Sequence, residues 1–287
     1  MKIEVRNLCK KYDSFMALDQ INLTFETGMF GLLGANGAGK TTLIKILASI
    51  LKPTSGKIIY NDSIICNKKE LRKNIGYIPQ KFSFYPNMTV FEVMDYFCAL
   101  NDVKKKSRQR IDELLETVHL SEKRYLKTKE LSGGMMQRLG IAVALICDPK
   151  LLLVDEPTVG LDPKERIHFS NVLTTFSKDR TILLSSHIVS DNEATCKNLA
   201  ILNHGTVAFQ GPVDKLLELC KGKVWEVEVE EEISAEVEQE YAISHKLLCE
   251  NDRVKLRIVS EEKPLDTAIG VEPKLNDAYI YIIESEE

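Results

Sequence analysis

The sequence predicts an α/β fold with a largely parallel sheet, followed by a small α+β appendage. Short apolar segments alternate with helical segments through most of the chain, which is typical of a parallel sheet. The charge balance changes near residue 220. Residues 221–287 hold 8 basic and 18 acidic side chains, whereas the first 220 hold 30 basic and 24 acidic ones. We therefore expect one large domain over residues 1–220 and a small acidic domain over residues 221–287.

Composition excludes several classes of protein. The 287 residues are 44% hydrophobic and 28% charged, which are ordinary globular values and argue against a disordered or coiled-coil chain. No run of about 18 apolar residues occurs, so we expect no membrane span, and the start lacks the apolar core of a signal peptide. The seven cysteines are scattered and odd in number, which predicts buried thiols of a reducing compartment rather than a disulfide framework.

The predicted elements follow one another in a regular order. Alternating residues predict strands at Ile3–Val5 and Ile21–Phe25, and an apolar run predicts a buried strand at Phe30–Leu33. The later elements expected are a helix over 42–51, a strand over 57–60, a helical region over 89–126, a helix over 133–147, strands over 151–154 and 181–184 with a helix from Pro163 between them, and strands over 225–229 and 253–259.

A glycine-rich loop lies between the strand at 30–33 and the helix that follows. Residues 34–41 read Gly-x-x-x-x-Gly-Lys-Thr, whose glycines let backbone N–H groups curl around phosphate oxygens at a positive helix N-terminus. Lys40 would supply charge to the β- and γ-phosphates, and the Thr41 hydroxyl would bind Mg²⁺. The residues expected to contact the nucleotide are Gly34, Ala35, Asn36, Gly37, Ala38, Gly39, Lys40, Thr41 and Thr42.

Two adjacent carboxylates end the apolar strand at 151–154. Asp155 suits Mg²⁺ coordination, and Glu156 is placed next to it to polarise an attacking water as a general base. The alternative is that Asp155 only caps the turn at Pro157. The phosphate-binding loop upstream favours the catalytic interpretation.

A second anion site is predicted at residues 131–138, which read Leu-Ser-Gly-Gly-Met-Met-Gln-Arg. Ser132 is an N-cap candidate, and Gly133 and Gly134 would expose the first N–H groups of a helix. One nucleotide seldom needs two such sites in one chain, so each ATP is expected to lie between two subunits. This segment resembles the signature motif of the ATP-binding cassette (ABC) family, which implies a head-to-tail dimer with ATP sandwiched between its subunits.

The resemblance covers residues 2–220 and implies a P-loop NTPase (RecA-like) core, an N-terminal antiparallel β subdomain and a helical signature subdomain at about 81–147. It also implies residue roles. Tyr12 would stack on adenine, and Gln80 would contact Mg²⁺ or the attacking water. Asp162 would lie in the loop that crosses the dimer interface, and His187 would contact the γ-phosphate and orient the base. All these motifs are intact, which favours two identical competent sites in a homodimer, with a heterodimer as the alternative.

The resemblance further implies a task. The segment after Gln80 is similar to that of bacterial type-2 exporters, so we expect an ATPase subunit that powers a separate integral membrane permease from the cytoplasmic face of the membrane, for export. Phe82, Phe84, Tyr85 and Phe91 would either dock on that permease or belong to the subdomain core. Residues 271–281 resemble the helix that closes many exporter cassettes, with departures at Lys274 and Asn276.

A soluble ABC ATPase of translation or DNA repair is the alternative. Translation factors of this family usually carry two cassettes and repair ATPases carry long insertions, whereas this chain has one cassette without an insertion. The acidic appendage also predicts no nucleic-acid partner, since such binding relies on Lys and Arg contacts to phosphate. A kinase or GTPase is excluded by the motif at 131–138.

Overall fold

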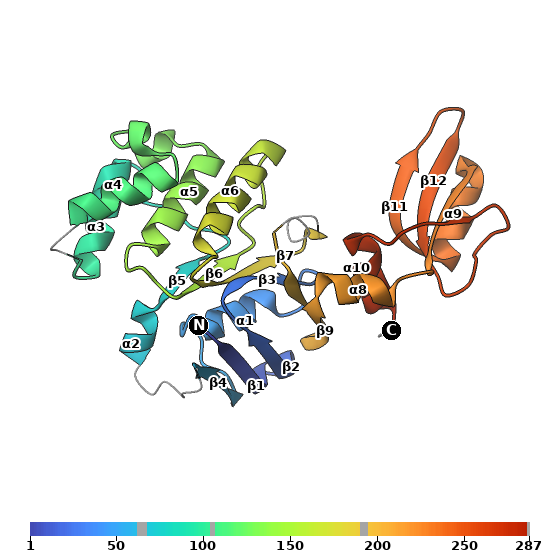
Figure 1. The fold of residues 1–287 in the computed structure, drawn as a ribbon, viewed down its shortest axis with the longest axis horizontal. Helices are drawn as coiled ribbons and strands as arrows, with labels where there is room; N and C mark the ends of the chain where they lie inside the picture. The colour runs from blue at the N-terminus through green and yellow to red at the C-terminus, as the bar shows by residue number, and fades with distance from the viewer. Residues whose placement is uncertain (62–67, 104–106, 190–194, 286–287) are drawn as a thin grey trace.

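The structure, a computed structural model, describes residues 1–61, 68–103, 107–189 and 195–285; Cys66 lies outside these ranges. In them, no helix is long and apolar enough to span a bilayer. Figure 1 shows a large α/β part and, at the other end of the long axis, a small sheet with one helix. Two helices, α8 (Val213–Leu219) and α10 (Leu275–Glu284), lie between them.

The main sheet confirms the predicted α/β class. Its strand order is β5-β6-β7-β3-β8-β9, and every neighbouring pair is parallel except β8 and β9. The strands are β3 (Gly28–Leu33), β5 (Ile75–Ile78), β6 (Leu151–Asp155), β7 (Thr181–Ser186), β8 (Asn198–Asn203) and β9 (Thr206–Pro212). Every residue of β6 and β7 is buried, as expected of a parallel sheet covered on both faces.

A separate three-stranded antiparallel sheet forms the N-terminal subdomain, in the order β2-β1-β4. Its strands are β1 (Ile3–Tyr12), β2 (Phe15–Phe25) and β4 (Ser55–Tyr60), each longer than the apolar alternation predicted. This sheet shares a hydrophobic cluster with α1 (Lys40–Leu47) and the main sheet. Helix α1 ends before the predicted Leu51 because the chain turns at Ser49, whose φ is 58°.

The helical subdomain divides the predicted 89–126 region into separate helices. It contains α3 (Val90–Leu100), which Thr89 and Glu92 cap reciprocally, and α4 (Ser107–Thr117), followed by two short 3₁₀ turns at Ser121–Lys123 and Thr128–Glu130. Two further helices pack beside them, α5 (Gly133–Ala144) and α6 (Pro163–Phe176). Helix α5 is shorter than the predicted span to Cys147, and α6 begins at Pro163 as predicted. A short helix, α2 (Lys68–Lys73), precedes β5.

The C-terminal part has the predicted α+β composition. Four antiparallel strands are arranged in the order β11-β12-β10-β13, and α9 (Glu231–Glu240) covers one face. The strands are β10 (Val224–Glu230), β11 (Ala242–Leu248), β12 (Arg253–Val259) and β13 (Ile269–Gly270). Glu226 on β10 contacts Lys255 and Arg257, and these contacts lower its pKa.

Helix α10 brings the end of the chain back to the cassette. Leu275 and Ala278 on α10 are fully buried in a cluster that also contains Leu33, Leu199 and Ile201 of the main sheet. Leu33 directly precedes the glycine-rich loop. Residues from both sides of the predicted boundary at residue 220 therefore belong to one hydrophobic cluster.

A buried ion pair attaches α10 to the small sheet. Arg257 on β12 is 6% exposed, and its guanidinium contacts Asp277, which is 1% exposed, through Nε at 2.9 Å and Nη2 at 2.8 Å. Asp277 also accepts hydrogen bonds from the Ser244 hydroxyl and from the Lys274 N–H. One carboxylate thus connects β11, β12 and the first turn of α10.

Asp277→Ala is expected to lower the free energy of unfolding of this part by about 3–5 kcal/mol, because it removes the buried carboxylate that Nε and Nη2 of Arg257 contact and leaves the guanidinium with the less buried Glu226. The single tryptophan, Trp225 on β10, reports the change in a urea titration followed by fluorescence. Asp266→Ala removes an exposed carboxylate of the same region and serves as the control. A loss below about 1 kcal/mol, the range of surface pairs, would contradict this account.

Candidate functional site

The glycine-rich loop joins β3 to α1 and surrounds a buried lysine. Lys40 is 4% exposed, and its Nζ donates to the carbonyl oxygens of Gly34, at 2.7 Å, and Ala35, at 3.0 Å. Gly39 has a φ of 102°, and a Cβ there would lie 2.7 Å from the Ala17 oxygen. The loop therefore requires glycine at this position and cannot accept a side chain without moving β2.

A pocket of about 340 Å³ opens above this loop. The residues that line it are Tyr12, Phe15, Ala17, Asn36, Gly37, Gly39, Lys40, Thr41, Thr42, Gln80 and Glu156. Tyr12 and Phe15 pair across the β1–β2 turn, and they are 42% and 62% exposed. Phe15 was not predicted from the sequence, although two aromatic residues flanking a two-residue turn beside the loop are a recognisable signal.

The carboxylate of Asp155 lies at the end of β6, against α1. Its Oδ1 accepts hydrogen bonds from Thr41 Oγ1 at 3.2 Å and from Ser185 Oγ at 2.8 Å. Its Oδ2 is buried and has no hydrogen-bond partner among the described residues. Burial raises the pKa of Asp155, because desolvation outweighs these two hydrogen bonds. An unpartnered carboxylate oxygen beside a hydroxyl is a donor set that suits a hard divalent cation.

Glu156 collects three contacts from three different segments. It is 5% exposed, and its oxygens lie 3.1 Å from Lys40 Nζ, 3.2 Å from His187 Nδ1 and 2.9 Å from Gln80 Nε2. Its backbone has a φ of 44°, which is uncommon for a residue other than glycine, and its N–H donates to Ser185. Ser185 holds both Asp155 and Glu156 because β7 lies beside β6, and the sequence analysis did not identify it.

The predicted residues fall into two groups in this chain. Tyr12, the loop 34–42, Gln80, Asp155, Glu156 and His187 lie at or next to the pocket. Ser132, Gly133, Gly134 and Asp162 do not line it. Ser132 is exposed and caps α5, accepting from the Met135 N–H at 3.2 Å, and Asp162 caps α6, accepting from the Glu165 N–H at 2.9 Å.

A parallel sheet with a loop that surrounds a buried lysine after β3, and with paired carboxylates at the end of β6, one strand away, defines a P-loop nucleotide-hydrolysing cassette. The model of the family described as "ABC transporter" matches residues 18–159. The chain belongs to the ATP-binding proteins of ABC transporters, which bind ATP and couple its hydrolysis to transport.

Relatives that align with this chain over most of their own length are also ATP-binding proteins of transporters. It is 34% identical to the uncharacterized ABC transporter ATP-binding protein YxlF of Bacillus subtilis, over 84% of this chain and 81% of the relative. It is 39% identical to the bacitracin transport ATP-binding protein BcrA of Bacillus licheniformis, over 75% of this chain and 71% of the relative. Identity to the Nod factor export ATP-binding protein I of Cupriavidus metallidurans is 33%, over 75% and 73%.

Solved structures of cassettes share the fold. An ATP-binding subunit of an ABC transporter superposes with a TM-score of 0.68 at 27% identity, over 76% of this chain and 93% of the other. CbiO1 of Clostridium perfringens, part of the CbiONQ transporter complex, superposes with a TM-score of 0.67 at 29% identity, over 75% of this chain and 90% of the other. A dimeric cassette bound to ADP and Pi superposes with a TM-score of 0.64 at 25% identity, over 73% of this chain and 98% of the other.

Proposed function

We propose that this chain is the ATPase subunit of an exporter and works as a dimer with two ATP molecules between its cassettes. The observation that carries the proposal is the separation of the site into two groups. The phosphate loop and Glu156 line one pocket, whereas the N-terminus of α5 is exposed and apart from it. If a second copy of the chain faced the first, the phosphate loop of one copy and the α5 N-terminus of the other would meet around the same phosphates.

Export and location are drawn from the relatives. The bacitracin transport and Nod factor export proteins are ATP-binding components of transport systems, so we assign export to this chain and a peripheral place at the cytoplasmic face of the membrane. A soluble role in translation or DNA repair is not favoured, because these relatives are transport proteins.

The proposed reaction begins with the release of Glu156. The Glu156 carboxylate pairs with Lys40. Phosphates that bind to Lys40 would replace this carboxylate, which would then be available to polarise a water. His187 and Gln80 already contact this carboxylate and would hold it in position. Thr41, Asp155 and Gln80 would hold Mg²⁺, which would neutralise charge on the β- and γ-phosphates. Ser132 and Gly134 of the second copy would bind the γ-phosphate, so hydrolysis would weaken the dimer.

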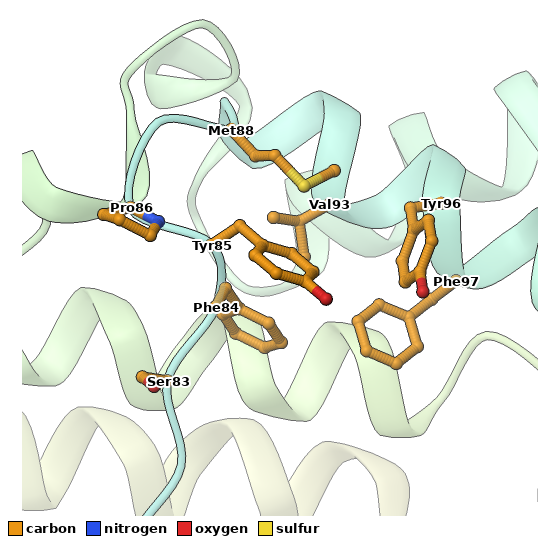
Figure 2. Close-up of a pocket in the computed structure, with 8 residues that line it drawn as sticks. All are labelled: Ser83, Phe84, Tyr85, Pro86, Met88, Val93, Tyr96 and Phe97. Atoms are coloured by element: carbon orange, nitrogen blue, oxygen red, sulfur yellow. The ribbon is translucent and has the colours of Figure 1, made fainter.

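The permease is proposed to dock on an aromatic pocket in the helical subdomain (Figure 2). The pocket is about 360 Å³, and its lining is Ser83, Phe84, Tyr85, Pro86, Met88, Val93, Tyr96 and Phe97. The Tyr85 ring extends toward Tyr96, edge to face at 6.4 Å between centroids, and the two are 66% and 42% exposed. Phe82, Phe84 and Phe91 pack on the subdomain core, whereas Tyr85 is exposed, so we assign docking to Tyr85 among these four residues.

The docking pocket is connected to the catalytic pocket through one short segment. Gln80 and Phe84 are four residues apart, and Gln80 donates to Glu156. Between them, Phe82 covers α5 at Gly140, where an added Cβ would lie 2.4 Å from its ring. A permease segment that moves Phe84 or Tyr85 would therefore affect both Glu156 and α5, called the signature helix because it begins within the motif at 131–138. Docking would be coupled to hydrolysis in this way.

Co-purification tests the proposal. Tagged wild type extracted in mild detergent is expected to bring down an integral membrane protein, and the double variant Tyr85→Ala/Tyr96→Ala is expected to lose it because the exposed rings that would anchor the contact are gone. Tyr125→Ala, which truncates a 74% exposed tyrosine outside the pocket, should retain it. Circular dichroism checks the fold of all three. Recovery of ribosomes or DNA in place of a membrane protein would overturn the proposed function.

A further inference from the structure

One side of the first turn of the signature helix, at the buried Gly134, is covered by a side chain from another helix of the same chain, whereas Ser132 and Gly133 are exposed. Glu165, in the first turn of α6, places its carboxylate where a side chain of residue 134 would be. A Cβ added at Gly134 would lie 2.2 Å from Glu165 Oε2 and 2.5 Å from its Cδ. The absence of a side chain at Gly134, which is buried, therefore leaves the space that Glu165 fills.

The same carboxylate also has a charged neighbour on the signature helix. Its Oε1 lies 3.6 Å from Nη2 of Arg138, which is one helical turn beyond Gly134. Arg138 is 9% exposed, and its Nη1 donates to the carbonyl oxygens of Val118, at 3.3 Å, and His119, at 3.4 Å, beyond the end of α4. Glu165 therefore neutralises part of a mostly buried guanidinium that connects α5 to α4.

Glu165 also lies one turn after the loop that contains Asp162. Its own N–H donates to Asp162 Oδ1, the cap of α6. Leu161 approaches the same end of α5, with its Cδ2 3.8 Å from where a Cβ of Gly133 would be. Two segments that the proposed dimer would present to the partner's nucleotide, residues 132–134 and the Asp162 loop, thus lie against each other through Glu165 and Leu161.

We propose that Glu165 is a positioning residue that holds the signature helix N-terminus and the Asp162 loop of one subunit in a fixed arrangement, so that both reach the partner's ATP together. This rests on the proposed ATP-sandwich dimer. Glu165 does not line the pocket around Lys40, so its role concerns dimer closure and not the binding of nucleotide by the single subunit. Shape and charge both contribute, since the side chain fills the space over Gly134 and pairs with Arg138.

The test uses the full chain in a Glu156→Gln background, in which the Mg-ATP dimer is expected to persist. Glu165→Ala should weaken Mg-ATP-dependent dimerisation about tenfold, measured by sedimentation velocity, because the side chain that packs α6 against the first turn of α5 is lost. Glu165→Gln, which keeps the shape without the charge, should weaken it less. Glu116→Ala removes an exposed carboxylate on α4 and should have no effect. Binding of a fluorescent ATP analogue below the dimerisation range should be unchanged in all variants, and circular dichroism should show each of them folded at the assay temperature.

Gly134→Ala disrupts the same contact between Glu165 and α5 from the other helix. The added methyl group would overlap Oε2, Cδ and Cγ of Glu165, at 2.2, 2.5 and 2.8 Å, and would displace this side chain, so the variant should dimerise as weakly as Glu165→Ala. The double variant Gly134→Ala/Glu165→Ala should be no weaker than either single variant, because both changes remove one contact. Additive effects, or an unchanged dimer constant for Glu165→Ala, would overturn the positioning role. If the Glu156→Gln parent itself fails to dimerise with Mg-ATP, the proposed function fails, and the role of Glu165 fails with it.

Discussion

Glu156→Gln is expected to bind ATP and to hydrolyse it about 10²–10⁴-fold more slowly than the wild type, because the amide cannot act as a general base. Glutamine keeps the shape of the side chain but loses the ion pair with Lys40, whose Nζ lies 3.1 Å from Glu156 Oε1. Phosphates would then no longer compete with a carboxylate for Lys40, so ATP affinity should be equal to or tighter than that of the wild type. Phosphate release and binding of a fluorescent nucleotide measure the two quantities.

The same variant should accumulate as a dimer in Mg-ATP, since the shared phosphates are not consumed. Gel filtration with and without Mg-ATP distinguishes the dimer from the monomer. Glu116→Gln, an exposed change of the same type on α4, should hydrolyse ATP at the wild-type rate and remain monomeric after turnover. A Glu156→Gln protein that elutes as a monomer in Mg-ATP, while the wild type hydrolyses normally, would rule out the sandwich.

Ser132→Arg is expected to abolish turnover and to spare nucleotide binding by the single subunit. Ser132 is exposed, caps α5 and does not line the pocket around Lys40, so a large cation there would obstruct only the partner's site. Ser132→Ala separates this effect from the loss of the cap, which costs about 0.5–2 kcal/mol of helix stability and should reduce turnover only in part. ATPase rates and single-subunit nucleotide affinity measure the result.

Mixing the two inactive proteins tests the arrangement across the dimer directly. A heterodimer of Ser132→Arg and Glu156→Gln subunits would contain one site with both lesions and one site with neither. Hydrolysis is therefore expected to reappear on mixing, in proportion to the heterodimer formed. Two inactive variants that remain inactive at every ratio would contradict a site built from two subunits.

The parts of the site that are contiguous in the chain could be predicted from the sequence. Residues 34–41 and 131–138 carry their chemistry in a local turn and the first turn of a helix, so residue type and spacing are sufficient to identify them. Thr41 and Asp155 were each predicted as Mg²⁺ ligands from residue type, and they meet because β3 and β6 end at the same edge of the parallel sheet. Helix ends were predicted less well. Helix α1 stops at Leu47 where Ser49 turns the chain, although its apolar pattern continues to Leu51.

Contacts between distant segments could not be predicted. The three partners of Glu156 come from residues 40, 80 and 187, and their distances depend on how β3, β5, β6 and β7 are ordered in the sheet. Phe15 joined the pocket through the register of one hairpin, and Ser185 through the register of β7 beside β6. Neither register is visible in a local pattern of residue types.

The sequence by itself determined the class of protein, since a glycine-rich loop with its lysine, the motif at 131–138 and paired carboxylates have few other uses in that order. Only the tertiary structure decided which of these groups share a pocket within one chain and which are left facing outward. It also showed that Glu165 lies over Gly134 and that α10 returns to the core beside Leu33. The physical reason is that chemistry follows residue type, which a sequence lists, whereas contact follows packing, which depends on the whole chain at once.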